Sequence, residues 1–251
     1  MMRDWHQPGE TADRLAFHIQ PQPDDSTCGP TCLQAVYHYF DDEAHLDDVI
    51  AEVPALRAGG TLAVLLACHA LRRGYKATIY TYNVQVFDPT WFNRGEVDVA
   101  EKLIGQREAK PDEMLRAATD GYLEFLRLGG KLRFEDLTTS LIRRYLKDGV
   151  PILTGLSATY LYHSPREFGP TNVEDDVRGL PVGHFVVLCG YQKDTRQVLI
   201  ADPLHPNPVS DTHIYSVSID RVVGAILLGV ITHDANLLLI RPKRNRAERT
   251  P

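Results

Sequence analysis

Apolar residues recur at helical spacing in the segment that follows Cys28. The apolar positions of this segment are Leu33, Val36, Tyr37 and Phe40. Such spacing predicts an amphipathic helix with one buried face. Pro30 suits the first turn of this helix, where a missing backbone N–H costs no hydrogen bond. The pattern therefore predicts a helix that begins close to Cys28 and packs against the core.

The middle of the chain alternates between helical and strand patterns. Helices are predicted at 61–73, 97–107, 111–128 and 137–147, and strands at 75–82 and 150–156. Three of these helices fall between about 95 and 149, which we interpret as a helical insertion in a single domain that spans residues 1–251. A late apolar run at 222–231 is too short to cross a bilayer and predicts a core helix.

Two apolar runs in the last third of the chain predict a β-hairpin. The runs cover 183–191 and 197–201, a polar turn at 192–196 separates them, and Pro203 stops the second. His184 opens the first strand and Asp202 follows the second, so both lie at the end away from the turn. Asp194 lies in the turn, at the far end. The register is not predicted, because a slip of one residue turns a side chain to the other face.

A long polar stretch leads from the strand at 150–156 to His184. Residues 157–182 contain several glycines and prolines and predict a loop. A long loop beside a candidate base suggests a lid or a wall of a substrate cleft. A surface insertion without a role is equally consistent with the pattern. Tyr160, Tyr162 and His163 are the candidates in this loop to line a cleft.

The composition is that of a globular protein with a full core. The chain has 251 residues, of which 43% are hydrophobic, and a net charge of −6 at pH 7. This charge argues against a nucleic-acid-binding protein, which needs a basic face. The first ten residues carry no apolar signal region. A basic tail that begins at about residue 241 is expected to be solvated and disordered; its basic residues are Arg241, Lys243, Arg244, Arg246 and Arg249.

The four cysteines differ in their surroundings. A chain of this length with four cysteines does not predict a disulfide scaffold, and a reducing cytoplasm is the expected location. Cys68 and Cys189 lie within apolar runs and are expected in the core. Cys28 lies among turn residues at a predicted helix start, where the positive end of the helix dipole favours a reactive thiolate. Gln22 lies six positions upstream, and its amide is a candidate oxyanion donor.

A nucleophilic cysteine needs a base, and the base needs a group that orients it. The predicted hairpin offers both, because this geometry can set the carboxylate of Asp202 beside the imidazole of His184. Asp194 is the weaker candidate for the orienting group, since it lies in the turn. The sequence therefore offers Cys28, His184 and Asp202 as a candidate catalytic set.

Three short motifs occur in a characteristic order along the chain. They are Gln-x5-Cys-Gly from Gln22, Gly-His-Phe-Val-Val-Leu from Gly183, and Ala-Asp-Pro from Ala201. In this order the motifs resemble the cysteine peptidases that remove double-glycine leader peptides. Those domains are best known as the N-terminal part of bacteriocin-exporting ABC transporters. The span between the first two motifs is longer here than in the short transporter domains, so the chain looks like a free-standing relative with an inserted segment.

The resemblance implies an α+β, papain-like fold in which an N-terminal helix carrying the cysteine packs on an antiparallel sheet carrying the histidine and the aspartate. It makes Cys28 the nucleophile, His184 the general base and Asp202 its orienting group, and it assigns Gln22 to the oxyanion hole. The implied substrate is a peptide or protein, and the implied role is peptide processing or maturation. No metal ion or organic cofactor is implied.

Other functions remain open at this stage. The same triad supports acyltransferase or transglutaminase-type transfer, because an amine can replace water at the thioester. A catalytically silent peptide-binding module is a further alternative. A redox pair of Cys28 and Cys32 is disfavoured, since three residues separate them instead of two and the pair leaves His184 unused. A zinc site is a weak alternative, because no compact second pair of ligands follows; His163, His205 and His213 are expected at the surface or in loops.

Overall fold

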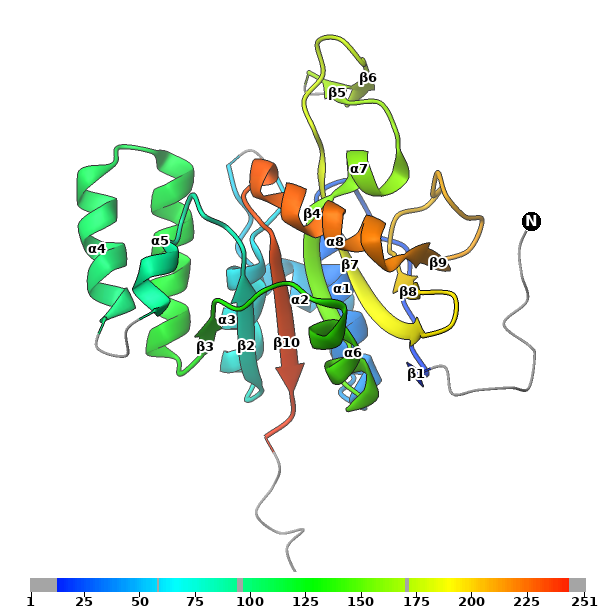
Figure 1. Cartoon of the computed structure of the whole chain (residues 1–251), viewed down its shortest axis with the longest axis horizontal. Coiled ribbons are helices and arrows are strands. Elements are labelled where there is room, and N and C mark those ends of the chain that lie inside the picture. The colour runs from blue at the N-terminus through cyan, green and yellow to red at the C-terminus, as the bar shows by residue number, and fades with distance from the viewer. Residues whose placement is uncertain (1–12, 58, 94–96, 170–171, 244–251) are drawn as a thin grey trace, which may run out of the picture.

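The computed structural model describes residues 13–57, 59–93, 97–169 and 172–243. A sheet of eight strands runs through its centre (Figure 1). Its order is β3 (Lys131–Arg133), β2 (Lys76–Thr81), β10 (Asn236–Arg241), β4 (Ile152–Ser157), β7 (Gly183–Gln192), β8 (Gln197–Ala201) and β9 (Ile214–Ser218), and β1 (Asp13–Arg14) pairs with β7. All neighbouring strands are antiparallel except β2 and β3, which are parallel.

Helices cover both faces of this sheet. On one face lie α1 (Cys28–Tyr39), α2 (Leu46–Glu52) and α3 (Ala63–Arg72), and on the other lie α6 (Thr139–Lys147) and α8 (Ile219–Leu228). The helices α4 (Val99–Ala109) and α5 (Glu113–Arg127) stand side by side beyond the β2–β3 edge of the sheet (Figure 1). The short helices η1 (Pro89–Phe92) and η2 (Gly229–Thr232) lie in connections.

The strand β7 shows why the central strands read as continuous apolar runs. Its side chains alternate between two cores: Phe185 and Val187 pack with α1 to α3, whereas Val186 and Leu188 pack with α6 and α8. Because helices bury both faces, neither set of alternate positions has to be polar. The second residue of β7, His184, is therefore unusual as a buried polar residue in an apolar strand.

The predicted fold class is confirmed: the chain is α+β, with a large, mostly antiparallel sheet. The helices expected at 97–107, 111–128 and 137–147 are α4, α5 and α6. Strand β3 was not predicted, since it is a short edge strand with two charged residues. The interpretation of the region near 95–149 as an insertion in a single domain stays a prediction.

The segment 157–182 is not the plain loop that its composition predicts. It contains α7 (Ala158–Tyr162) and a hairpin of β5 (Glu167–Phe168) and β6 (Val173–Glu174). The hairpin projects above the sheet and its helices (Figure 1). Polar residues obscured these elements because each is very short and few of their side chains are buried.

Two expectations for the end of the chain need correction. The run at 222–231 belongs to α8 and η2, and it is not wholly a core element, because Leu227, Leu228 and Ile231 are exposed. Arg241 is still part of β10, pairs with Lys76 and stacks on a tyrosine ring, so a tail can only begin after it. The other basic residues of the expected tail from Arg244 onwards, and the expected absence of a signal region, lie outside the described residues. Within the described part of the chain, no helix is long and apolar enough to span a membrane.

Candidate active site

Cys28 is the first residue of α1, as the sequence predicts, and its side chain is buried, with 8% of the residue exposed. A tight turn precedes it. Asp24 accepts hydrogen bonds from the backbone and the hydroxyl of Ser26, and the hydroxyl of Thr27 donates to the Asp24 carbonyl over 3.1 Å. The backbone N–H groups of the first helical turn have no acceptor within the helix. The thiol therefore lies at the positive end of α1, beside free N–H donors.

Gly29 allows the start of α1 to approach its neighbours closely. A Cβ atom at this position would lie 2.7 Å from Cγ2 of Thr61 and 3.3 Å from Cδ2 of Phe185. A larger residue would clash with Thr61 and crowd Phe185 of β7, so the first turn of α1 would have to shift. The glycine thus fixes the distance between Cys28 and the strand that carries His184.

We expect Gly29→Ala to lower the free energy of unfolding by about 1–3 kcal/mol, because overpacking a tight contact costs this much. It should also slow alkylation of Cys28 by displacing the thiol from His184. Gly105→Ala is the matched control, since a Cβ there meets nothing within 4 Å. Rates of iodoacetamide labelling and urea unfolding curves measure both effects. Equal labelling rates in the two variants would show that Gly29 does not set the position of the thiol.

The predicted contact between His184 and Asp202 is present. Nε2 of His184 lies 2.8 Å from Oδ1 of Asp202, within the hydrogen-bond distance that a catalytic pair requires. Both residues are buried, with 8% of His184 and none of Asp202 exposed. Because an ionised carboxylate only accepts, Nε2 carries the proton of this bond. The other ring nitrogen, Nδ1, is left for a second partner.

A bulge in β7 explains why these two side chains meet. Cys189 is an extra residue in β7 between two positions that pair with consecutive residues of β8. Beyond the bulge Val187 pairs with Ala201. This register sets Asp202 on the same face of the sheet as His184, as a diagonal neighbour. Without the extra residue, His184 and Asp202 would lie on opposite faces of the sheet.

The Cys28 thiol interacts with the imidazole of His184 and contributes to its raised pKa. Although α1 packs on the opposite face of the sheet, His184 lies at the end of β7 that the start of α1 reaches; Cys32, one turn further along α1, bonds to the Phe185 carbonyl over 3.2 Å. Burial by itself disfavours the charged imidazole. The charge and hydrogen bond of Asp202, together with a hydrogen bond to Cys28, outweigh burial and raise the pKa of His184. The site therefore favours an imidazolium beside the sulfur.

Asp202 accepts hydrogen bonds from five donors. Oδ1 is bonded by His184 and by the backbone N–H of Leu204, at 3.0 Å. Oδ2 is bonded by the hydroxyl of Tyr162 at 2.7 Å, the hydroxyl of Tyr215 at 2.6 Å and the amide of Asn207 at 3.0 Å. Burial of the carboxylate is opposed by the charge and hydrogen bond of His184 and by other donors, which together lower the pKa of Asp202. It is a fully satisfied buried anion.

Gln22 is tied through its backbone to the segment that follows Asp202. Its N–H donates to the carbonyl of Pro203, next to Asp202, over 2.9 Å. Its side-chain Nε2 donates to the carbonyl of Asp24 over 2.8 Å, which uses one of the two amide hydrogens. Its Oε1 is buried and has no hydrogen-bond partner. The amide is therefore held by the turn before Cys28, and its second N–H remains available.

The remaining cysteines are unsuited to nucleophilic chemistry. Cys32 is fully buried, and burial raises the pKa of its thiol well above the ordinary value. Burial likewise raises the pKa of Cys68 to about 11 and that of Cys189 to about 12. All four cysteines are free thiols. The expectation that Cys68 and Cys189 are core residues is confirmed.

We therefore expect iodoacetamide to label Cys28 before the other three cysteines of the folded protein at neutral pH. The thiolate is the reactive form, and the other thiols stay protonated and enclosed. Mass spectrometry of tryptic peptides taken at short times measures the order of labelling. Earlier labelling of Cys68 or Cys189 would contradict the assignment of Cys28 as the reactive thiol.

The weaker candidates lie elsewhere. Asp194 is exposed in the turn between β7 and β8, away from His184. His163 and His205 are exposed, as expected; His213 is half-buried and bonds through Nδ1 to the carbonyl of Asp202 over 2.8 Å. No group of three or more His, Cys, Asp or Glu side chains suited to a metal ion occurs among the described residues.

Sequence reasoning missed Tyr215 and Asn207 and gave Tyr162 only as a candidate to line a cleft. Tyr215 is a buried residue of β9, and the alternating pattern of that strand was the available signal for it. Asn207 lies in an irregular connection between β8 and β9, where no pattern predicts a contact with Asp202. Tyr160 points elsewhere and packs against Gly224 of α8.

Comparison with known proteins supports the resemblance seen in the motifs. A model of the Peptidase_C39 like family matches residues 115–219, which include His184 and Asp202 but not Gln22 or Cys28. No curated protein matches the chain significantly. The family match confirms the predicted resemblance to C39-type peptidases and the predicted enzyme class, a cysteine peptidase.

Solved structures with a similar chain path include three peptidases. A putative C39-like peptidase from Bacillus anthracis is 13% identical, with a TM-score of 0.48, and the alignment covers 94% of this chain and 100% of the other. The peptidase domain of Streptococcus ComA, a bi-functional ABC transporter, is 14% identical, with a TM-score of 0.43 and coverage of 90% and 99%. A double glycine motif protease from an AMS/PCAT transporter, solved with its leader peptide, is 15% identical, with a TM-score of 0.43 and coverage of 92% and 94%.

Proposed function

We propose that this chain hydrolyses peptide bonds through a triad of Cys28, His184 and Asp202, and that it acts in the processing or maturation of a peptide or protein substrate. The observation that carries the proposal is the 2.8 Å contact between Nε2 of His184 and Oδ1 of Asp202, at the end of β7 that the start of α1, with Cys28, reaches. Nucleophile, base and orienting group in this order are what acyl transfer to a cysteine requires.

In the proposed reaction the Cys28 thiol gives its proton to Nδ1 of His184. The thiolate then attacks the carbonyl carbon of the scissile peptide bond, and a C–S bond forms while the carbonyl becomes an oxyanion. The backbone N–H of Cys28 and the free amide hydrogen of Gln22 stabilise this oxyanion. One such donor contributes about 2.7–4 kcal/mol to transition-state stabilisation in other enzymes.

The tetrahedral intermediate collapses when His184 returns the proton to the leaving amine and the C–N bond breaks. The product is a thioester on Cys28. A water molecule then loses a proton to His184 and attacks the thioester, which releases the carboxylic acid and restores the thiol. Throughout both halves, Asp202 remains ionised and keeps the imidazole in one tautomer and orientation.

The chemistry of the site also bears on location and ligands. A thiol nucleophile with three further free cysteines suits a reducing compartment, so we place the protein in the cytoplasm. The net charge of −6 favours a peptide or protein substrate over nucleic acid. The reaction as written needs no metal ion and no organic cofactor.

Peptide hydrolysis can be tested without knowing the substrate. The protein is incubated with a broad mixture of peptides in water enriched in heavy oxygen, and the products are analysed by mass spectrometry. Protein alkylated with iodoacetamide is the control. We expect new C-termini that carry one heavy oxygen, because water is the final acyl acceptor, and none in the control.

Two other results would each replace the proposal. Peptides joined to added amines, without heavy oxygen at a new C-terminus, would identify an acyltransferase at the same triad. Peptide binding that survives alkylation, with no cleavage or transfer at all, would identify a catalytically silent binding module.

A further inference from the structure

Tyr162 connects Asp202 to a segment outside the hairpin that carries the proposed triad. The other donors to the carboxylate come from β7, from β9 or from the connection that follows β8. Tyr162 instead ends α7, in the segment between β4 and β7. Its hydroxyl donates to Oδ2 over 2.7 Å, and its ring centroid lies 6.1 Å from that of His184. The side chain therefore touches both members of the buried pair.

Two hydrogen bonds join the two ends of the segment 158–182. The N–H of Ala158 donates to the carbonyl of Val182 over 2.8 Å, and the N–H of Val182 donates to the hydroxyl of Thr159 over 2.9 Å. Tyr162 lies close to the first end, and the second end comes immediately before His184. Both ends of the segment are thus tied to the triad.

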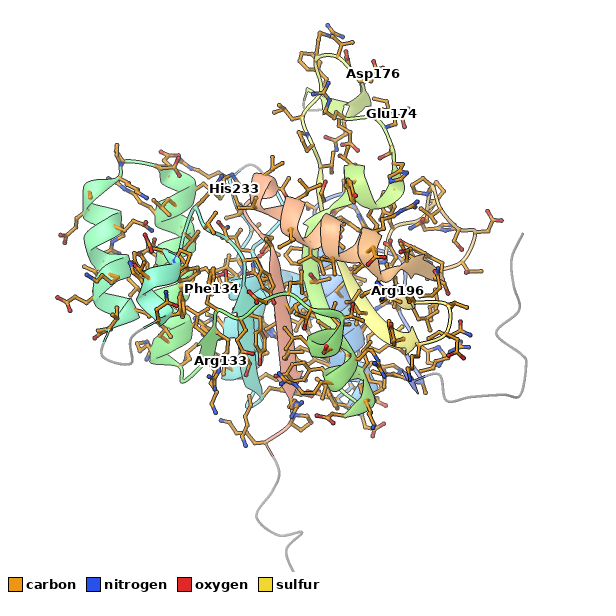
Figure 2. The ribbon with its side chains drawn as sticks, in the orientation of Figure 1. Arg133, Phe134, Glu174, Asp176, Arg196 and His233 are labelled. Atoms are coloured by element: carbon orange, nitrogen blue, oxygen red, sulfur yellow. The ribbon has the colours of Figure 1, made fainter. Side chains whose placement is uncertain are left out.

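The far part of the segment reaches the turn that precedes Cys28. The amide of Asn172 donates to the carboxylate of Asp25 over 3.5 Å. Burial, together with repulsion by the nearby carboxylates of Asp25 and of Glu174 in β6, raises the pKa of Glu167 in β5. Figure 2 shows Glu174 in this projecting hairpin, well above the sheet. The segment therefore extends from Asp202 towards the nucleophile's own loop.

We propose that Tyr162 is a positioning residue for the proposed triad: its hydroxyl holds Oδ2 of Asp202 so that Oδ1 stays directed at Nε2 of His184. The inference rests on the proposed function. A carboxylate can turn about its Cβ–Cγ bond, and its donors decide which oxygen faces the imidazole. Without Tyr162, the remaining donors to Oδ2 are Tyr215, in β9, and Asn207, in the connection that precedes β9.

Tyr162→Phe removes this one hydroxyl and keeps the packing of the ring. We expect kcat/KM for peptide cleavage to fall about tenfold, mostly in kcat, because hydrogen bonds to charged groups have roughly this effect. The bond from Asp202 stabilises the charged imidazole of His184. A weaker bond should let His184 lose this charge at a lower pH, and the pH profile of Cys28 alkylation should shift accordingly. Tyr160→Phe, two residues earlier on the same helix, is the matched control and should behave as the wild type.

The alkylation profile separates this inference from the proposed function, because it needs no substrate. A wild-type rate that is already high well below about pH 8.5, combined with an unchanged profile in Tyr162→Phe, would overturn the positioning role and leave the peptidase proposal intact. A wild-type rate that rises only near pH 8.5, as for an ordinary thiol, would overturn both. If Tyr162→Phe folds poorly, the proton NMR signal of the His184–Asp202 bond in its folded fraction serves instead: a shifted signal supports the inference, and an unchanged signal contradicts it.

Discussion

Cys28→Ala is expected to lower peptide cleavage by about 10⁴-fold or more, because the variant has no nucleophile and loss of such a group removes most of the rate enhancement. The protein itself should be little affected. Cys28 is the first residue of α1, where its side chain fixes no hydrogen bond of the helix, and losing one sulfur atom there should cost less than about 1 kcal/mol of stability. Cleavage of a peptide substrate and urea unfolding curves measure the two effects separately.

Cys32→Ala is the matched control, since it makes the same change one helical turn further along. It removes the hydrogen bond from the Cys32 thiol to the carbonyl of Phe185 and leaves a small cavity, so it should cost about 1–2 kcal/mol of stability. Cleavage should continue. The opposite pattern, with activity lost in Cys32→Ala and kept in Cys28→Ala, would move the nucleophile by one turn.

Asp202→Asn is expected to lower kcat by about 10⁴-fold, which is the effect of the same change in a Ser-His-Asp triad. The asparagine side chain has one oxygen and one NH₂ group, whereas hydrogen-bond donors surround both oxygens of Asp202. Its NH₂ group must therefore face donors on one side of the site. An amide oxygen facing Nε2 would leave N–H groups against the hydroxyls of Tyr162 and Tyr215. An amide N–H facing Nε2 would force the other tautomer of His184, with its proton on the nitrogen that must accept from Cys28.

The same variant should also unfold more easily, by about 2–3 kcal/mol near pH 6, because it loses charge-assisted hydrogen bonds. The lowered pKa of Asp202 gives stability above about pH 3.9 that is lost as the pH falls through the folded value. The raised pKa of His184 gives stability that is full below about pH 6.5 and is lost as the pH rises through its folded value. The difference from wild type should therefore shrink at both ends of the pH range.

Asp194→Asn provides the control for Asp202→Asn, since Asp194 is exposed in the β7–β8 turn. It should cleave and unfold as the wild type does across the pH range. Normal cleavage by Asp202→Asn would show that the buried carboxylate is structural, and loss of cleavage in Asp194→Asn would move the orienting role to the turn.

The parts of the site that depend on local pattern were predictable from the sequence. The helical spacing after Cys28 and the turn residues before it predict a helix start at this cysteine, where α1 does begin. The two apolar runs around a polar turn predict the β7–β8 hairpin and set His184 and Asp202 at the same end. Both inferences use only neighbours in sequence, which is why they did not need the fold.

The parts that depend on register and on distant contacts were not predictable. The bulge at Cys189 decides whether His184 and Asp202 share a face; Gly190 hints at an irregularity in β7, but the sequence does not say which residue is the extra one. Tyr162 and Tyr215 reach the same carboxylate from elements that lie far apart in the chain. The polar sequence of 157–182 predicts a loop, because a five-residue helix and a hairpin of two-residue strands are too short to produce a periodic pattern.

The thioester is the intermediate on which the account depends, and trapping it tests the account most directly. The protein is mixed with a peptide that it cleaves, quenched in acid at short times, and digested for mass spectrometry. We expect the acyl part of the peptide on Cys28, and none on Cys32, Cys68 or Cys189. Cleavage that proceeds without an adduct on Cys28, in wild type and in Cys28→Ala alike, would contradict the proposed peptidase mechanism.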